Sequence, residues 1–269
     1  MKKWGFPLIR ELPAIVTTEG WRWERFSGYR DFWIGTDASS NSWLVKQKGT
    51  WNAIREHIYA DFAQSLGICT QSSVYLTLDK HSMPLMGEWH PDKTPYNVGI
   101  WKFDEHGREP CGLECPRHKL NKLRPHAAPL KTWFECGIRN PWDMIEARFL
   151  GFLCGMFEPI QPLVTKSHLW VQIDNELTFS DWPFERGKLC ESVMQEIRGD
   201  PFFKIEGAAK RIRNLCSRIC DITDIEIARI TTAPDEFRHR TLLAKVRRHI
   251  LQLHRTAHLI SDNLYAIGY

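Results

Sequence analysis

The chain has 269 residues, of which 43% are hydrophobic and 25% are charged, and its formal net charge is +4. These proportions exclude a disordered chain, a collagen and a coiled coil, and the small charge argues against a protein that coats nucleic acid. No apolar stretch reaches the roughly 18 residues of a membrane-spanning helix, and no apolar segment of a secretory signal follows the basic first residues. We therefore expect a cytoplasmic protein whose eight cysteines are reduced thiols.

The first hundred residues have the pattern of strands around one helix. Residues 21–26 alternate large aromatic side chains with polar ones. Residues 31–36 and 42–46 are largely apolar runs on either side of a polar turn, which predicts a β-hairpin. In residues 51–66 an apolar side chain recurs at every fourth position, which predicts a helix that ends at Gly67.

The rest of the chain changes from strands to helices. Further strands are expected at 73–78, 97–103 and 168–174. Helices are expected at 142–156 and 238–263, where apolar residues recur every three to four positions.

This order of elements indicates a fold class. Strands followed by helices favour an α+β protein with two lobes rather than an alternating parallel sheet. We expect a β-rich N-lobe over residues 1–103 and a helical C-lobe over residues 104–269.

A lysine and a glutamate form the first candidate site. Lys46 ends the second strand of the predicted hairpin, and Glu56 lies in the helix that follows. In protein kinases a strand lysine holds the nucleotide phosphates and a helix glutamate holds that lysine. The alternative is an ordinary solvated lysine at a strand end.

Asp174 is the second candidate, because it ends an apolar strand at a tight turn. A carboxylate in that place would lie at the rim of a cleft, and Mg²⁺ bound with substrate phosphates takes one or two such ligands. The alternative is an aspartate that only shapes the turn.

Taken together, three segments resemble the HipA-like kinases, which share the two-lobed protein-kinase-like fold. W-I-G-T-D…S-W-L-V-K at 33–46 is similar to the hairpin that covers the nucleotide in that family. E-H-I-Y-A…L-G-I at 56–68 is similar to its glutamate helix, and I-D-N-E-L-T-F at 173–179 to its I-D-H-G-x-A-F segment. The resemblance covers residues 25–182.

The resemblance implies roles for the candidate residues and a source for the protein. Lys46 would bind the phosphates of ATP, Glu56 would orient Lys46, and Asp174 would bind Mg²⁺. It also implies a bacterial protein that acts with a protein partner or substrate.

The chain departs from the family where catalysis would occur. Between the helix at 142–156 and the strand at 168–174, family members carry N-x-D-R-x-x-N. In this chain residues 155–162 are G-M-F-E-P-I-Q-P. Glu158 and Gln161 are the nearest chemical substitutes for the catalytic base and the second magnesium ligand. Two functions follow: an ATP-dependent kinase that phosphorylates a protein Ser/Thr, or an inactive pseudokinase that serves as a binding or assembly subunit.

Two further features could bind ligands. His106, Cys111, Cys115 and His118 have side chains that could enclose a structural zinc ion, although a loop with incidental Cys and His is the alternative. From residue 204 onward there are 12 Lys and Arg against 7 Asp and Glu, which indicates either a solvated helix face or a surface for an acidic protein or nucleic acid. The basic residues in question are Lys245, Arg247, Arg248 and Arg255.

Overall fold

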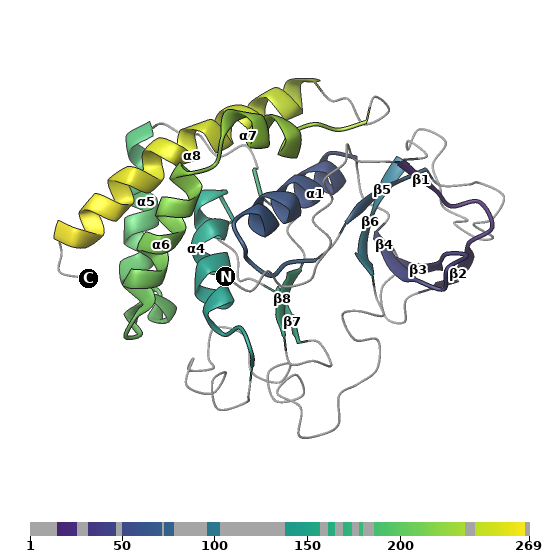
Figure 1. Ribbon diagram of the computed structural model, residues 1–269, viewed down its shortest axis with the longest axis horizontal. Helices are drawn as coiled ribbons and strands as arrows, with labels where there is room; N and C mark the ends of the chain where they lie inside the picture. Colours follow the sequence, from purple (N-terminus) through teal and green to yellow (C-terminus); the bar gives the residue numbers. More distant parts are fainter. Residues whose placement is uncertain are drawn as a thin grey trace.

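The computed structural model describes residues 15–25, 32–46, 50–71, 73–77, 96–102, 138–156, 161–164, 169–173, 178–179, 186–234 and 240–266. Strands gather at one side of the molecule and helices at the other (Figure 1). Within the described residues, no helix combines the length and apolar character that a membrane crossing requires. The expected mixture of a strand-rich first part and a helical second part is therefore confirmed.

A six-stranded sheet forms the first part. Its order is β1-β5-β6-β4-β3-β2, and neighbours are antiparallel except for the parallel pair β1 and β5. The strands are β1 (Ile15–Thr17), β2 (Arg22–Arg25), β3 (Phe32–Thr36), β4 (Ser42–Lys46), β5 (Val74–Thr77) and β6 (Tyr96–Lys102). The predicted hairpin is the pair β3 and β4, while β1 was not predicted.

The sheet must curl, because its two edge strands are consecutive in the chain. The edges of six flat strands would be about 24 Å apart, whereas the connection from β1 to β2 can span only about 17 Å. The curled sheet encloses a small apolar cluster of Trp21, Val45 and Leu76. A side chain at Gly35 would collide with Trp21, since a Cβ there would lie 2.6 Å from its Cε3 atom.

Helix α1 (Thr50–Ser65) packs on the other face of the sheet, as its periodicity predicts. Ile54, Ile58 and Phe62 belong to one buried cluster together with Ile34 of β3. Gly67 follows with a φ of 76°, a left-handed conformation that ends the helix.

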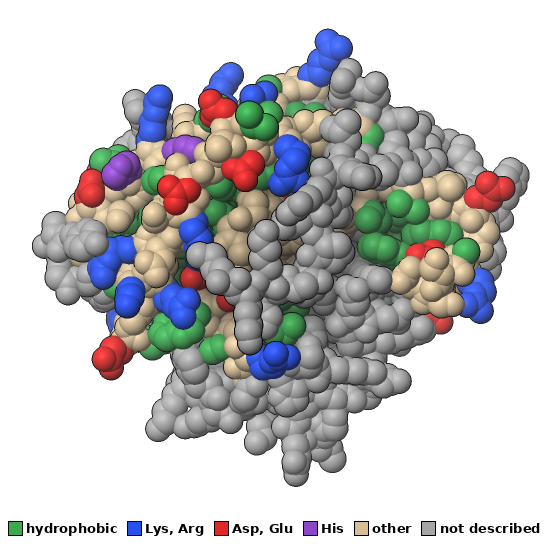
Figure 2. All heavy atoms as spheres, in the orientation of Figure 1, with side chains coloured by type: hydrophobic (Ala, Val, Ile, Leu, Met, Phe, Trp, Pro, Cys, Tyr) green, Lys and Arg blue, Asp and Glu red, His purple; other side chains and the backbone are tan. Residues whose placement is uncertain are grey.

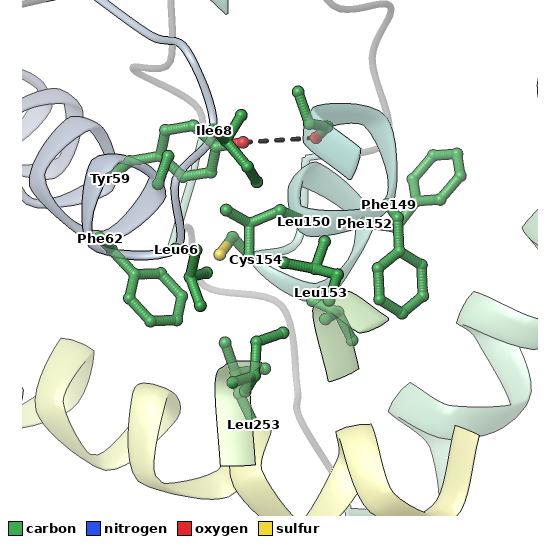
Figure 3. Close-up of a cluster of buried hydrophobic side chains, with 14 of the residues drawn as sticks. Tyr59, Phe62, Leu66, Ile68, Phe149, Leu150, Phe152, Leu153, Cys154 and Leu253 are labelled. Carbon is green, nitrogen blue, oxygen red and sulfur yellow. Dashed lines mark hydrogen bonds between the residues drawn. The ribbon is translucent and has the colours of Figure 1, made fainter. Parts of the chain in front are cut away.

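The second part is built around α4 (Trp142–Leu153), in which every residue from Met144 to Leu153 is buried. This helix is shorter than predicted, because Gly155 adopts a φ of 79° and the Met156 N–H bonds back to the Gly151 carbonyl. In Figure 3 its Leu153 and Cys154 lie between α1 and Leu253 of the last helix.

Among the residues that the structure describes, five further helical segments and a two-stranded sheet remain. They are β7 (Gln161–Val164), β8 (Trp170–Ile173), α5 (Arg186–Gly199), η1 (Pro201–Lys204), α6 (Ala208–Cys220), α7 (Asp224–Ile230) and α8 (Arg240–Ala266). Helix α8 packs along α6 and also contacts α5 and α7. Its predicted apolar stripe is confirmed, since Leu242, Val246 and Ile250 are fully buried.

Candidate functional site

The structure places the predicted lysine and glutamate on neighbouring elements. Lys46 is the last residue of β4, and the structure describes its backbone. Glu56 lies on α1 and is 1% exposed, so its carboxylate is withdrawn from water. The Gln71 side chain donates a hydrogen bond to Glu56 Oε1 over 2.8 Å. The glutamate carboxylate is thus held inside the protein by Gln71.

The pairing register locates the hairpin turn relative to Lys46. Phe32 is opposite Lys46, and Thr36 is opposite Ser42. The polar turn 37–41 therefore lies at the far end of the hairpin from Lys46. The connection that reaches β3 beside Lys46 is formed by residues 26–31, which are outside the described part of the chain.

Asp37 organises that distant turn. Its carboxylate accepts hydrogen bonds from the Asn41 N–H at 2.8 Å, the Ser39 N–H at 2.9 Å and Trp43 Nε1 at 3.2 Å. Partial burial opposes ionisation, but the hydrogen bonds from Asn41, Trp43 and Ser39 outweigh it and lower the pKa of Asp37. A turn with a fixed negative charge is suited to shaping the hairpin rather than to contacting phosphates.

The β7–β8 hairpin carries the remaining candidates. Gln161 is paired with Ile173, and Asp174 is the next residue along the chain. Gln161 therefore begins strand β7, which the sequence did not predict. The structure brings its backbone close to the residue before Asp174, whereas Glu158 and Asp174 themselves are outside the described residues.

Strand β8 is fastened directly to the segment that follows α1. The Gln71 N–H donates to the Gln172 carbonyl at 3.1 Å, and the Gln172 N–H donates to the Cys69 carbonyl at 3.2 Å. The Tyr59 hydroxyl donates to Gln172 Oε1 at 3.0 Å. Gln71 therefore binds Glu56 with its side chain and β8 with its backbone, which links the glutamate to the strand that leads into Asp174.

The chain beyond Asp174 is fixed at Phe179. Its N–H donates to the Cys154 carbonyl at 2.8 Å, and its φ of 55° is uncommon for a residue other than glycine. The Phe179 ring lies 6.5 Å from that of Tyr59 and meets His249 edge-on at 5.3 Å. These contacts hold Phe179 against Tyr59 of α1, His249 of α8 and the residue that follows α4.

His249 is an uncharged link within this group. Its Nε2 lies 2.9 Å from the Leu153 carbonyl oxygen, which can only accept a hydrogen bond, so Nε2 carries the proton. Burial lowers the pKa of His249 to about 4, despite the opposing effect of that hydrogen bond. The imidazole is therefore neutral at pH 7.

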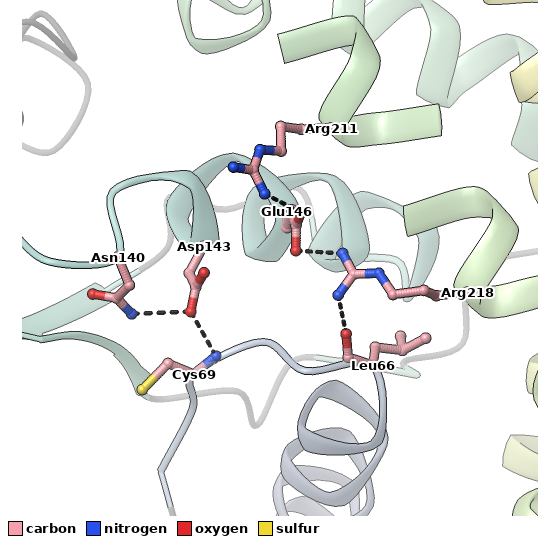
Figure 4. Close-up of polar contacts among 7 residues, drawn as sticks. All are labelled: Leu66, Cys69, Asn140, Asp143, Glu146, Arg211 and Arg218. Atoms are coloured by element: carbon pink, nitrogen blue, oxygen red, sulfur yellow. Dashed lines mark hydrogen bonds and ion pairs between the residues drawn. The ribbon is translucent and has the colours of Figure 1, made fainter. Parts of the chain in front are cut away.

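A second polar group anchors the segment after α1 to the helices (Figure 4). Arg218 of α6 donates both to the Leu66 carbonyl and to Glu146 of α4. The Cys69 N–H donates to Asp143 Oδ2 at 3.1 Å. The position of α1, and with it of Glu56, is therefore set by helices of the second part.

Asp143 confers a specific pH dependence on stability. Burial raises its pKa to about 6, with Glu146 adding to the effect and hydrogen bonds from Asn140 and Cys69 opposing it. The pKa of an aspartate in the unfolded chain is about 3.9. Between pH 4 and pH 6 the folded state therefore binds more protons than the unfolded state, and the free energy of unfolding should fall as pH rises through this range. Asp143→Asn keeps a side-chain oxygen for the two donors, the Cys69 N–H and the Asn140 side chain. As pH rises from 4 to 7, the stability of this variant relative to the wild type should increase by about 1 to 3 kcal/mol.

Urea unfolding of both proteins at several pH values measures this difference. His249 has the opposite dependence, because its pKa is lowered and the unfolded state binds the extra proton. Its contribution cancels when the variant is compared with the wild type. A difference that stays constant over the whole pH range would contradict the assignment.

The other sequence predictions lie elsewhere. His106, Cys111, Cys115 and His118 are outside the described residues, and no group of three or more possible metal ligands occurs among the residues that are described. Lys245, Arg247, Arg248 and Arg255 are exposed on α8. Gln71 and Gln172 were not predicted as parts of the site, because their contacts join segments that are distant in sequence. Phe179 ends the segment 173–179 that resembles the family, but no role was predicted for it.

Comparison with known proteins gives matches among solved structures. No protein family matches the chain, and no curated protein does. Among solved structures, the chain is similar to the Helicobacter pylori proinflammatory kinase CtkA, with a TM-score of 0.50 and 13% identity over 91% of this chain and 99% of that one. At this identity the similarity concerns the fold. The fold resembles that of a kinase.

Proposed function

We propose that the protein is a HipA-like, two-lobed kinase-fold protein that binds ATP with Mg²⁺. The observation that carries the proposal is the continuous bonding from Glu56 through Gln71 to β8, which ends beside Asp174. It joins the two places where a kinase fold holds nucleotide phosphates and metal. The fold similarity to the kinase CtkA supports the same conclusion.

Each residue has a defined part in this proposal. Lys46 binds the phosphates from the end of β4, and Glu56 orients Lys46 from α1. Asp174 supplies a carboxylate for Mg²⁺, which prefers oxygen ligands. Bound Mg²⁺ would neutralise the charge of the phosphates, while Gln71, Tyr59 and Phe179 hold the protein groups in place.

Transfer of phosphate to a protein Ser/Thr would need a base near this site. Glu158 is the candidate base, and Gln161 is the candidate second metal ligand. The backbone pairing of Gln161 with Ile173, the residue before Asp174 in the sequence, supports the second role. The carboxylate of Glu158 would accept the proton of the hydroxyl group that attacks the phosphate.

The second candidate is a pseudokinase that acts as a binding or assembly subunit. It is favoured by residues 155–162, which contain neither Asp nor Asn. In that case nucleotide binding would serve stability or regulation rather than chemistry.

Thermal unfolding with and without Mg-ATP tests nucleotide binding. Ligand at about 100 times its Kd stabilises a protein by about 2.7 kcal/mol, which for a chain of this size is a rise in Tm of roughly 5 to 10 °C. Lys46→Met and Asp174→Ala should abolish the shift, and Asp221→Ala, at an exposed aspartate after α6, should keep it. An unchanged Tm for the wild type would refute the proposal.

Radiolabelled ATP separates the two candidates. Label on this protein or on an added protein substrate, lost in Glu158→Gln, supports the kinase. A Tm shift without any transferred label supports the pseudokinase.

A further inference from the structure

Helix α8 has an outer face that remains exposed among the described residues of the protein. Its inner residues form the core, but a series of residues one helical turn apart remains exposed. The exposed series consists of Arg240, Ala244, Arg247, Arg248, Leu251, Arg255, His258, Leu259 and Asp262. We call this series the α8 face. In Figure 2, Lys and Arg side chains project along the upper edge, where α8 lies, with hydrophobic side chains among them.

The α8 face is a straight stripe. Its members recur at intervals of three, four and seven residues, which places them on one side of a helix. From Arg240 to His258 the stripe is about 27 Å long. That length suits a partner helix of several turns.

Two leucines give the stripe an apolar component. Leu251 is 40% exposed and Leu259 is 49% exposed, and they are two of the large hydrophobic residues that the described structure leaves in water. Arg255 lies one turn from each. The leucines and Arg255 therefore present apolar and basic groups in alternation along the helix.

The charge of α8 is almost entirely of one sign. The helix contains five Lys and Arg residues, with Asp262 as its one acidic residue. Arg247, Arg248 and Arg255 are all exposed; the first two are adjacent, and Arg255 lies about two turns further along the helix. A partner that complements this face must be acidic and must also cover the leucines.

We propose that the α8 face binds an acidic amphipathic helix of a partner protein. The partner's apolar residues would cover Leu251 and Leu259, and carboxylates at heptad spacing would pair with Arg247, Arg248 and Arg255. This occupant uses both components of the stripe. A nucleic acid would use the arginines but would leave the leucines without a suitable contact, because its backbone is charged along its whole length.

Binding to the α8 face is independent of the proposed nucleotide site. The face points outward, whereas His249 on the same helix points inward to the Leu153 carbonyl. Substitutions on the face should therefore leave any Mg-ATP shift in Tm unchanged. The two proposals can fail separately.

A synthetic peptide tests the inference on the whole chain. The probe is a fluorescent helical peptide of about three heptads, with Leu at the a and d positions and Glu at e and g. We expect saturable binding by fluorescence anisotropy that weakens as salt rises from about 0.05 to 0.5 M. Arg247→Glu with Arg248→Glu should weaken binding by about tenfold or more, and Leu251→Ser with Leu259→Ser by about fivefold.

Controls separate this occupant from others. Arg198→Glu changes an exposed arginine at the end of α5 and should leave the affinity unchanged. A peptide with the same glutamates but Ser in place of Leu should bind more weakly. Equal binding of that peptide, no binding of the leucine peptide, or tighter binding of a DNA duplex or of anionic vesicles would each overturn the proposal.

Discussion

Replacing Arg218 by methionine should destabilise the protein by about 3 to 5 kcal/mol, because it deprives a buried carboxylate of its main counter-charge. The side chain of Glu146 is 5% exposed, and Arg218 contacts it directly while also binding the Leu66 carbonyl. The loss removes an anchor of the segment after α1 as well as an ion pair. Urea unfolding at pH 7 measures the change.

The second arginine near Glu146 provides the matched control. Arg211 lies 4.0 Å from the same carboxylate, and its side chain is 43% exposed. Arg211→Met should therefore cost less than about 1 kcal/mol. Adding Glu146→Gln to Arg218→Met should recover part of the stability. A similar loss from both arginine variants would contradict the assignment of Arg218 as the main partner.

Truncating Phe179 to alanine should have a comparable effect on stability and an additional effect on ligand binding. The ring is 1% exposed, so its removal leaves a cavity that costs about 3 to 5 kcal/mol. It also removes the contacts to Tyr59 and His249 that hold the segment after Asp174. If the proposed function is correct, Mg-ATP should bind more weakly by about tenfold.

Phe203→Ala separates the two effects. Phe203 is fully buried in η1 and packs on Phe152 with ring centres 5.9 Å apart. Its loss should reduce stability as much as the loss of Phe179, without changing the Mg-ATP affinity of the folded protein. Isothermal titration at a temperature where both variants remain folded makes the comparison. Equal affinities for the two variants would show that Phe179 has only a structural role.

Local sequence patterns predicted most of the regular elements. Strands β3 and β4 and helix α1 lie within about one residue of the expected ranges, because alternation and four-residue spacing are properties of consecutive residues. Strand β1 was missed because its three residues, Ile15–Thr17, are too few to show an alternating pattern. Strand β7 was missed because it contains Pro162, which a strand tolerates at a sheet edge.

The site was predictable only in part, for a related reason. Glu56 was singled out by the resemblance of its segment to a kinase glutamate helix, and its side chain is buried. Gln71 and Gln172 belong to no recognisable motif, and they acquire their role when the segment after α1 meets β8. Contacts of this kind depend on tertiary structure, which sequence periodicity does not report.

The central core also constrains how the protein forms during synthesis. One hydrophobic cluster joins residues from Ile34 in β3 to Leu264 in α8, and Leu253 packs beneath Leu66 and Cys154 in Figure 3. The apolar face of α6 that packs on α8 therefore stays open on a nascent chain until α8 has left the ribosome. During that interval the emerging protein is a natural client for chaperones that shield exposed apolar surface.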